Sequence, residues 1–363
     1  MIACSVLAQK PLEPIKLIDL DAQTDRQIVV DREQGQYLGH TSTVLLEDKR
    51  TILAVYPKGH GHGPIIFKRS SDGGKTWSGR LDVPQNWETS LETPTIFRTV
   101  DPKSHKKRLI LWSGLYPARL SHSENNGKTW TPLAKVGDWG GIVLMGFVEQ
   151  LHNGNYLAMF HDDGRFFTEN GKATGVFTLY KTFSEDGGLT WSTPEVVFSR
   201  SDIHLCEPGA VRSPNGKQLA VLLRENRRTR NSHIIFSNDE GQTWSEPREL
   251  PWTLTGDRHT AKYSPDGRLV ISFRDMASDN ATKGDWVAWV GRYEDLLSGG
   301  EGQYRVRLKN NFEGADCGYP GVEVLRDGTF VCTTYGHWNS GDQPYILCVR
   351  FKLSEIDSLA RRK

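Results

Sequence analysis

The chain has 363 residues, 37% of them hydrophobic and 25% charged, so it is long enough to bury a large core. Its 45 basic and 44 acidic side chains give a net charge of +1, which excludes the basic surface typical of a nucleic-acid-binding protein. No apolar run reaches the roughly 18 residues that span a bilayer. We therefore expect neither nucleic acid nor a membrane as a partner.

We expect one domain over residues 1–363, with residues 1–10 as the remnant of a signal peptide or a disordered start. Val6 and Ala8 fit the small-residue pattern that precedes a cleavage site, which favours a secreted or periplasmic protein, although a basic start and a full apolar region are missing. The five cysteines are scattered and include no C-x-x-C pair. This pattern predicts free, buried thiols and neither a disulfide framework nor a zinc site.

Six strand–turn–strand patterns follow one another along the chain, each an apolar strand, a polar turn that is often D-G or N-G, and a second apolar strand. They occupy residues 43–56, 95–112, 147–160, 210–223, 261–273 and 322–335. Together with the strands that follow each pair, they predict an all-β, six-bladed β-propeller of four-stranded antiparallel blades. A β-sandwich would not repeat one unit six times. The last blade lacks a fourth strand, so we expect residues 26–30 to pair with residues 345–351 and close the ring.

A short polar motif, S-x-[D/N]-x-G-x-T-W, occurs four times, starting at Ser70, Ser123, Ser184 and Ser237. Each copy follows a short apolar run, which indicates a hairpin turn. In such a turn the Asp or Asn side chain binds backbone amides, the glycine takes a positive φ, and the tryptophan packs between neighbouring blades. None of these residue types in this arrangement performs chemistry, so we interpret the motif as structural.

Antiparallel order places two sets of residues at one end of the central channel, which we call the upper face: those just before the first strand of each blade and those just after the second. The hairpin turns and the four motifs then lie at the other end. Polar side chains are dense at the upper-face positions, which predicts a ligand site built by several blades. The candidates before first strands are His40, Glu92, Glu207, Arg258, His259 and Tyr319, and those after second strands are His60, His62, Asp162, Asp163, Arg224, Arg274 and Trp338.

The motif resembles the Asp-box of sialidases, and six blades with such boxes are typical of that superfamily. Two further segments make the resemblance more specific. "CEPGAVRSPNGKQLAVLLREN" (206–226) is similar to the sialidase stretch in which a glutamate opens the first strand of the fourth blade and an arginine ends the second. "DCGYPGVEVLRDGTFVCTTY" (316–335) is similar to the last-blade segment that carries the sialidase nucleophile. The resemblance points to Glu207, Arg224 and Tyr319.

What the resemblance implies is a glycosidase acting on a terminal, acidic sugar, with a glycan or small sugar as partner. Sialidases use a tyrosine nucleophile, because an anionic one would be repelled by the carboxylate of the sugar. A phenol has a pKa of about 10 and needs a base, for which Glu207 is the candidate beside the nucleophile Tyr319. Arg224 would bind the acidic group of the substrate in a bidentate clasp.

The chain departs from the sialidase pattern at two of the three expected arginines. His40 stands in place of the first, and "TKGDW" (282–286) lies near the place of another. Arg258 and Arg274 are expected to supply the missing positive charge from their own upper-face positions. The remaining candidates for substrate contact are His40, His259, Glu92 and Trp338.

The loop "YPKGHGHGP" (56–64) replaces the one that carries the acid/base aspartate in the resemblance. Proton transfer is therefore assigned to His60 or His62, or to Asp162 or Asp163 across the channel. The two histidines of the H-x-H pattern are too few to complete a metal site, so we expect no metal and no cofactor.

Three functional hypotheses remain open at this point. The first is a sialidase-like glycoside hydrolase with an altered pocket. The second is a polysaccharide lyase that moves a proton at a uronic acid, and the third is a carbohydrate-binding propeller without catalysis.

Overall fold

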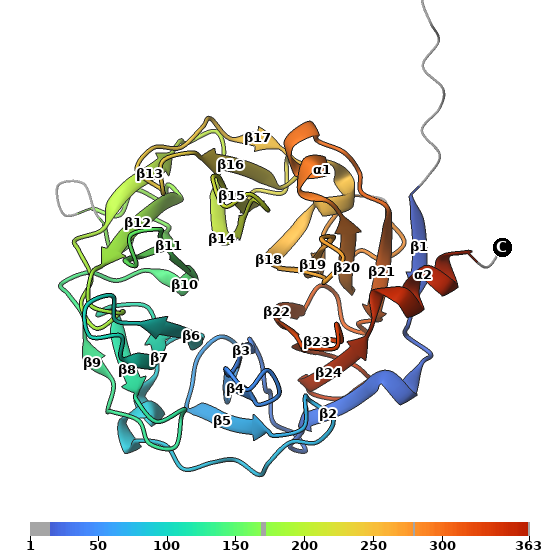
Figure 1. The fold of residues 1–363 in the computed structure, drawn as a ribbon, viewed down its shortest axis with the longest axis horizontal. Coiled ribbons are helices and arrows are strands. Elements are labelled where there is room, and N and C mark those ends of the chain that lie inside the picture. Colours follow the sequence, from blue (N-terminus) through green and yellow to red (C-terminus); the bar gives the residue numbers. More distant parts are fainter. Residues whose placement is uncertain (1–14, 168–171, 279, 362–363) are drawn as a thin grey trace, which may run out of the picture.

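The computed structural model describes residues 15–167, 172–278 and 280–361. Six sheets surround a central channel, with the first strand of each blade innermost and the later strands successively farther out (Figure 1). The predicted all-β, six-bladed propeller is confirmed. Residues 1–10, for which we predicted a signal remnant or a disordered start, lie outside the described residues.

The first three blades follow the chain in order from strand β3 onward. Blade 1 consists of β3 (Ser42–Leu45), β4 (Ile52–Pro57) and β5 (Ile65–Ser70). Blade 2 consists of β6 (Thr95–Val100), β7 (Lys107–Ser113), β8 (Arg119–Ser123) and β9 (Ala134–Lys135). Blade 3 consists of β10 (Ile142–Gln150), β11 (Tyr156–Asp162), β12 (Thr178–Ser184) and β13 (Glu195–Ser199).

The last three blades continue in the same way and take up both N-terminal strands. Blade 4 consists of β14 (Leu205–Arg212), β15 (Leu219–Glu225), β16 (His233–Ser237) and β17 (Arg248–Glu249). Blade 5 consists of β18 (Gly256–Tyr263), β19 (Leu269–Asp275), β20 (Trp286–Gly291), β21 (Tyr304–Lys309) and β1 (Lys16–Asp19). Blade 6 consists of β22 (Cys317–Val324), β23 (Phe330–Gly336), β24 (Tyr345–Phe351) and β2 (Gln27–Asp31).

Helices are few and lie at the rim of the ring (Figure 1). They are α1 (Tyr293–Ser298), α2 (Leu353–Arg361) and the 3-10 turns η1 (Thr24–Arg26), η2 (Gln85–Thr89) and η3 (Trp252–Leu254). None of the helices in the described ranges has the length and apolar character needed to cross a bilayer.

Ring closure occurs as predicted, because β2 pairs antiparallel with β24 in the register Ile28 to Cys348 and Val29 to Leu347. The side chain of Val30 is buried against the core between blades 6 and 1, whereas Val29 faces outward and is 50% exposed. An N-terminal strand thus supplies the outer edge of the last blade and leaves no open seam in the ring.

Two blades depart from the four-stranded pattern at their outer edges. In blade 1 the segment after β5 is too irregular to form a strand, although the amides of Ser78 and Leu81 still donate to the carbonyls of Arg69 and Phe67. In blade 5 the additional strand β1 pairs parallel with β21. Both departures lie at the outer edges of the blades, away from the channel.

The four S-x-[D/N]-x-G-x-T-W motifs form the turns that follow β5, β8, β12 and β16, and they hold themselves together by local hydrogen bonds. In blade 3, Asp186 accepts bonds from the amides of Leu189 and Thr190, each at 3.0 Å, and from the Thr190 hydroxyl at 2.6 Å. Trp191 packs on Trp112 of blade 2, with ring centroids 5.3 Å apart. The predicted turn role and the packing between blades are confirmed.

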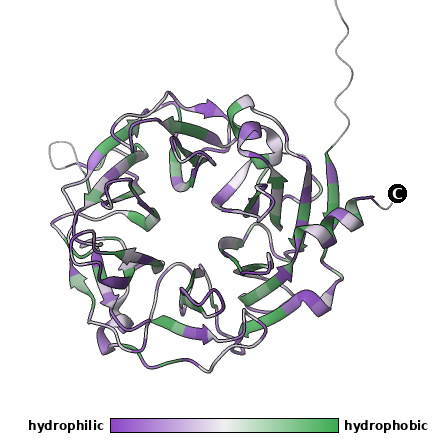
Figure 2. Cartoon of the chain, in the orientation of Figure 1, coloured by the Kyte–Doolittle hydropathy of each residue, from purple (hydrophilic) through white to green (hydrophobic). Residues whose placement is uncertain are grey.

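The hydrophobic core is divided into clusters that lie between adjacent blades, since each sheet buries both faces against its neighbours. Figure 2 shows that the strands carry most of the hydrophobic colour and that the connections between them are largely hydrophilic. Four cysteines of the described residues are free and buried, as predicted: Cys206, Cys317, Cys332 and Cys348. The fifth, Cys4, lies outside the described residues.

Candidate active site

Side chains reach the upper end of the channel through a repeated distortion at the start of the first strands. His40, Glu207, Arg258 and Tyr319 all adopt a left-handed backbone, with φ between 51° and 61°. In three of the four blades a bulge accompanies it, between residues 206 and 209, 257 and 260, and 318 and 321. A left-handed non-glycine residue costs about 1 to 3 kcal/mol, so four at matching positions indicate that the surrounding packing holds this backbone in place, a feature that is frequent at functional sites.

Two of these bulges share a three-residue pattern, E-P-G at Glu207 and Y-P-G at Tyr319. The glycines are required by close approach to the next blade, because a Cβ on Gly209 would overlap the carbonyl of His259, and one on Gly321 would overlap Thr43. Proline in the middle of each pattern has no N–H to leave unpaired in the bulge. The pattern was visible in the sequence, but its meaning depends on the neighbouring blade.

Tyr319, Glu207 and Arg224 come together although they lie up to 112 residues apart. The Tyr319 hydroxyl donates to Glu207 Oε1 at 2.5 Å, and Arg224 Nη1 donates to the same oxygen at 2.5 Å. Tyr319 and Glu207 are 8% and 3% exposed. The convergence expected from blade topology is therefore present in the structure.

The charges in this group set the protonation states of the tyrosine and the glutamate in opposite directions. Burial, together with the charge of Glu207, raises the pKa of Tyr319 well above its ordinary value. Burial also acts to raise the pKa of Glu207, but Arg224 and the Tyr319 hydrogen bond outweigh it and hold that pKa below its usual range. At neutral pH the pair is a neutral phenol beside an ionised carboxylate, which is the arrangement of a nucleophile and its base.

Arginine side chains surround a second carboxylate, that of Asp257 in β18, which is 1% exposed. Arg228 binds it with both terminal nitrogens, at 2.5 and 2.7 Å, and Arg274 binds it through Nε at 2.8 Å and Nη2 at 2.5 Å. Arg224 Nε lies 3.3 Å from the same group. Burial opposes ionisation of Asp257, but the arginines prevail and lower its pKa. Sequence reasoning missed Asp257 and Arg228, and it assigned Arg224 and Arg274 to the substrate.

A group of rings and one carboxylate lies beside the tyrosine, where blades 6 and 1 meet. The His40 ring is 4.5 Å from that of Tyr319 and stacks on Tyr335 at 4.6 Å, and the His60 ring lies 5.0 Å from that of His40. His60 Nδ1 lies 3.6 Å from Asp316 Oδ1, and His60 is 64% exposed. Sequence reasoning named both histidines but missed Asp316, which precedes Tyr319 by only three residues.

Asp316 also anchors the aromatic side of this group. It accepts hydrogen bonds from the hydroxyls of Tyr37, at 2.7 Å, and Tyr335, at 3.2 Å, and His337 Nε2 lies 3.1 Å from its other oxygen. His62, the second histidine of the H-x-H pattern, is exposed at the mouth of the site.

Glu92 and Arg258 are further charged groups near the upper end of the channel. Glu92 accepts a hydrogen bond from the Val143 amide at 2.5 Å, and burial raises its pKa to about 8. Arg258 Nη2 donates to the Met145 carbonyl at 2.9 Å, and its guanidinium lies 5.8 Å from the centre of the Tyr319 ring. Arg258 Nη1 is buried and has no hydrogen-bond partner among the described residues.

Three other candidates serve the fold in this structure. Asp162 Oδ2 accepts the amides of residues 164, 166 and 167 and so shapes the loop after β11. His259 is buried, with Nε2 at 2.8 Å from the Leu254 carbonyl, and Trp338 is buried, with Nε1 donating to the Tyr345 carbonyl at 2.9 Å. Their positions at strand ends were predicted correctly, but the side chains of His259 and Trp338 point into the core, and the Asp162 carboxylate is engaged by its own loop. Asp163 pairs with Arg165 at the surface.

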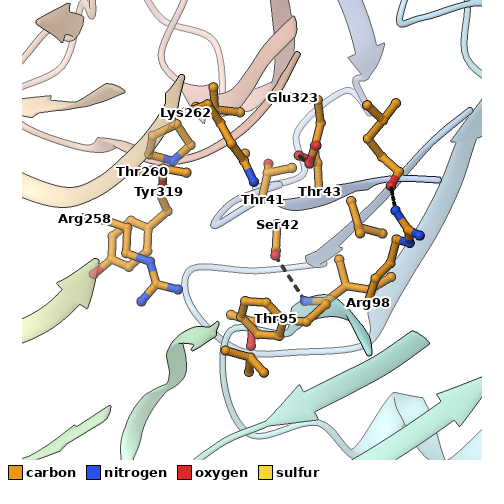
Figure 3. A pocket seen from close by; sticks show the side chains of 18 of the residues that line it. Thr41, Ser42, Thr43, Thr95, Arg98, Arg258, Thr260, Lys262, Tyr319 and Glu323 are labelled. Carbon is orange, nitrogen blue, oxygen red and sulfur yellow. Dashed lines mark hydrogen bonds between the residues drawn. The ribbon is translucent and has the colours of Figure 1, made fainter. Parts of the chain in front are cut away.

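A cavity of about 430 Å³ runs down the channel from Tyr319 and Arg258 (Figure 3). Its upper part is lined largely by hydroxyl side chains from the first strands, namely Thr41, Ser42, Thr43, Thr95 and Thr260. Within the described ranges, no three His, Cys, Asp or Glu side chains gather closely enough to hold a metal ion. The arrangement therefore offers hydroxyl and charged groups to a polar organic ligand.

The protein is thus a β-propeller in which a buried tyrosine, a buried glutamate and an arginine meet at the upper end of the channel. Residues 102–280 match the family model of the BNR repeat-like domain. No curated protein matches the chain. The match to BNR repeats covers about half of the chain, and the chain as a whole is a six-bladed β-propeller.

Solved structures agree with this fold assignment at low identity. A protein of unknown function from Dyadobacter fermentans DSM 18053 matches with a TM-score of 0.69 and 16% identity, over 90% of this chain and 97% of that chain. The intramolecular trans-sialidase from Ruminococcus gnavus, in complex with oseltamivir carboxylate, matches with a TM-score of 0.61 and 16% identity, over 90% of this chain and 96% of that chain. The Hadza microbial sialidase Hz136 matches with a TM-score of 0.63 and 17% identity, over 88% of this chain and 66% of that chain.

Proposed function

We propose that the protein is a retaining glycoside hydrolase of sialidase-like design that acts on a terminal sugar, with Tyr319 as nucleophile and Glu207 as its base. The observation that carries the proposal is the 2.5 Å hydrogen bond from the Tyr319 hydroxyl to Glu207 Oε1 at the upper end of the channel. The likeness of the fold to sialidases supports the choice of a sugar as the substrate.

In the first step the Tyr319 oxygen attacks the anomeric carbon while its proton passes to Glu207, and the glycosidic C–O bond breaks. Arg224 keeps Glu207 ionised until the proton arrives, because its Nη1 donates to the accepting oxygen. The product of this step is a tyrosyl glycoside, in which the anomeric carbon is bonded to the Tyr319 phenolic oxygen, with a protonated Glu207 beside it.

His60 is the group we assign to the leaving oxygen. Its ring contacts the ring of His40, which in turn contacts the ring of Tyr319, so His40 lies between His60 and the nucleophile. Asp316 Oδ1 lies 3.6 Å from His60 Nδ1, on the side of the ring opposite Nε2. In the second step neutral His60 takes a proton from water, the water oxygen attacks the anomeric carbon, and Glu207 returns its proton to the departing Tyr319 oxygen.

Elimination at a uronic acid is less well supported, because a lyase must neutralise the uronate carboxylate with a free cation. The candidate Arg274 is already bound to Asp257, and so is its neighbour Arg228. We therefore treat the lyase and the purely binding propeller as outcomes of the test rather than as further proposals.

The test is turnover of a panel of fluorogenic glycosides by the wild type, Tyr319→Phe and Glu207→Gln. Tyr319→Phe should lower kcat by at least about 10³-fold with little change in ligand affinity, since only the attacking oxygen is removed. Tyr304→Phe is the matched control, because its hydroxyl also donates to a carboxylate, Asp357, at 2.6 Å but on the outer part of blade 5.

Product analysis separates the alternatives. Nuclear magnetic resonance should show a sugar released with its anomeric configuration retained. An unsaturated product that absorbs in the ultraviolet would contradict the proposal in favour of a lyase, and binding without turnover would contradict it in favour of a binding propeller.

A further inference from the structure

We propose that Asp257 is a carboxylate that the protein itself supplies to its arginine cluster, so that the site takes a neutral sugar and not an acidic one. This inference rests on the proposed function, because it names the substrate class of the same pocket. It replaces the acidic sugar that the resemblance to sialidases led us to expect.

The first argument is that the arginines are bound to Asp257 in the geometry with which arginine binds a carboxylate ligand. Arg228 makes a bidentate pair with it, and Arg274 approaches it with two further nitrogens. Arg274 Nη1 is also occupied, since it donates to the carbonyls of Ala315 and Cys317. With Asp257 only 1% exposed, the space between these guanidinium groups is filled.

The second argument concerns the donors that remain. Arg224 Nη1 is bound to Glu207, and Arg258 Nη2 is bound to the Met145 carbonyl. Arg258 Nη1 and Arg224 Nε are then the buried arginine nitrogens of this site that lack a hydrogen-bond partner among the described residues, and Arg224 Nε lies 3.3 Å from Asp257. An acidic sugar would meet two separate nitrogens, one of which already faces Asp257, instead of a bidentate clasp, with the ionised Asp257 and Glu207 nearby in a site shielded from water.

The third argument is that the unpaired groups suit sugar hydroxyls. Beside the donor Arg258 Nη1, the buried atoms without a partner in the described part of the chain include the acceptor Glu207 Oε2 and the hydroxyl of Thr41. A sugar hydroxyl both donates and accepts, so it can satisfy such a mixture of groups. Thr41 and Arg258 line the same cavity, next to the hydroxyls of Ser42 and Thr95 (Figure 3).

The experiment on the wild type uses matched substrates that differ in the carboxylate. Methylumbelliferyl glucoside is compared with the glucuronide, and neutral galactoside and N-acetylhexosaminide substrates with the sialoside. Binding of the corresponding free sugars is measured by calorimetry. We expect affinity or kcat/KM to favour the neutral members by at least about tenfold. A preference for the acidic members would overturn the inference.

The variant Asp257→Ala tests the cluster directly, with acetate as the probe. Removal of the carboxylate leaves the arginines unpaired, so acetate at about 100 mM should raise the melting temperature of the variant by several degrees by binding the folded state, relative to chloride at equal ionic strength. The wild type and the control Asp31→Ala should not respond. Asp31 is a matched control because it also pairs with arginine, through Arg80, but on the outer strand of blade 6.

The outcomes separate this inference from the proposed function. Binding of neutral sugars without turnover would support the inference and contradict the hydrolase, whereas turnover of sialoside alone would do the reverse. If no sugar of the panel binds, the acetate measurement decides: stabilisation confined to Asp257→Ala supports the inference, and equal stabilisation of the wild type, or none at all, overturns it. If Asp257→Ala does not fold, Asp257→Asn is used, and it should gain at least about tenfold in affinity for acetate.

Discussion

Replacing Asp186 by alanine tests whether the Asp-box turns serve stability alone. Asp186 lies in the turn after β12, and the first residue of that box, Ser184, pairs with Tyr156 at the lower end of β11. Asp162 ends the same strand at the upper face, six residues away, or about 20 Å at the rise of a strand. A change at Asp186 should therefore leave the candidate active site untouched.

The expected loss follows from the hydrogen bonds that disappear. The Asp186 carboxylate accepts from the Ser184 hydroxyl, the amides of Leu189 and Thr190, and the Thr190 hydroxyl. Ser184 is buried, but the two Thr190 donors are exposed, so water replaces part of their bonds and the loss should total about 1 to 3 kcal/mol. For 363 residues the unfolding entropy is about 0.8 kcal/mol per kelvin, which converts this loss to a fall of about 1 to 4 °C in Tm.

The assay compares thermal melts with turnover per folded molecule for Asp186→Ala and Asp186→Asn. The second box already contains Asn125, whose oxygen accepts the Thr129 amide at 2.9 Å and whose Nδ2 donates to the Thr129 hydroxyl at 2.8 Å. Asp186→Asn should therefore lose less than half as much stability as Asp186→Ala. Reduced turnover at unchanged Tm would refute the reasoning, because it would place the box near the site.

Three further changes have expected outcomes. Val30→Ala should cost roughly 1 to 3 kcal/mol of unfolding free energy, and Val29→Ala less than about 0.5, in denaturant titrations, because only Val30 is buried at the ring closure. Burial raises the pKa of Glu92 to about 8 from 4.5, so between these pH values the folded protein keeps a proton that the unfolded chain releases. The free energy of unfolding should therefore fall as pH rises through this range, by up to about 5 kcal/mol. Glu92→Gln should flatten this dependence in thermal melts at several pH values. Arg224→Ala should raise the pKa of Glu207, which moves the acidic limb of the pH–rate profile to higher pH, and should cost about 3 to 5 kcal/mol of stability. An unchanged limb would show that Glu207 is not the base.

The sequence by itself determined the fold, because the signals that specify a propeller are local and repeated. Six hairpin patterns and four Asp-box turns each report their own geometry through alternating apolar residues, turn glycines and a capping carboxylate. Once the blades were counted, topology alone brought Glu207, Arg224 and Tyr319 to one end of the channel. It also placed residues 26–30 on the last blade.

Tertiary structure decided which side each upper-face residue presents and what it meets there. Trp338 and His259 have the same strand-end positions as the site residues, yet they point into the core, because orientation depends on bulges and left-handed residues that arise from packing between blades. The partner of an arginine is likewise a property of space. Arg274 was expected to bind substrate. Instead it binds Asp257, which lies 17 residues away along the chain and opposite it in the β18–β19 pair, and the sequence alone did not show this partner.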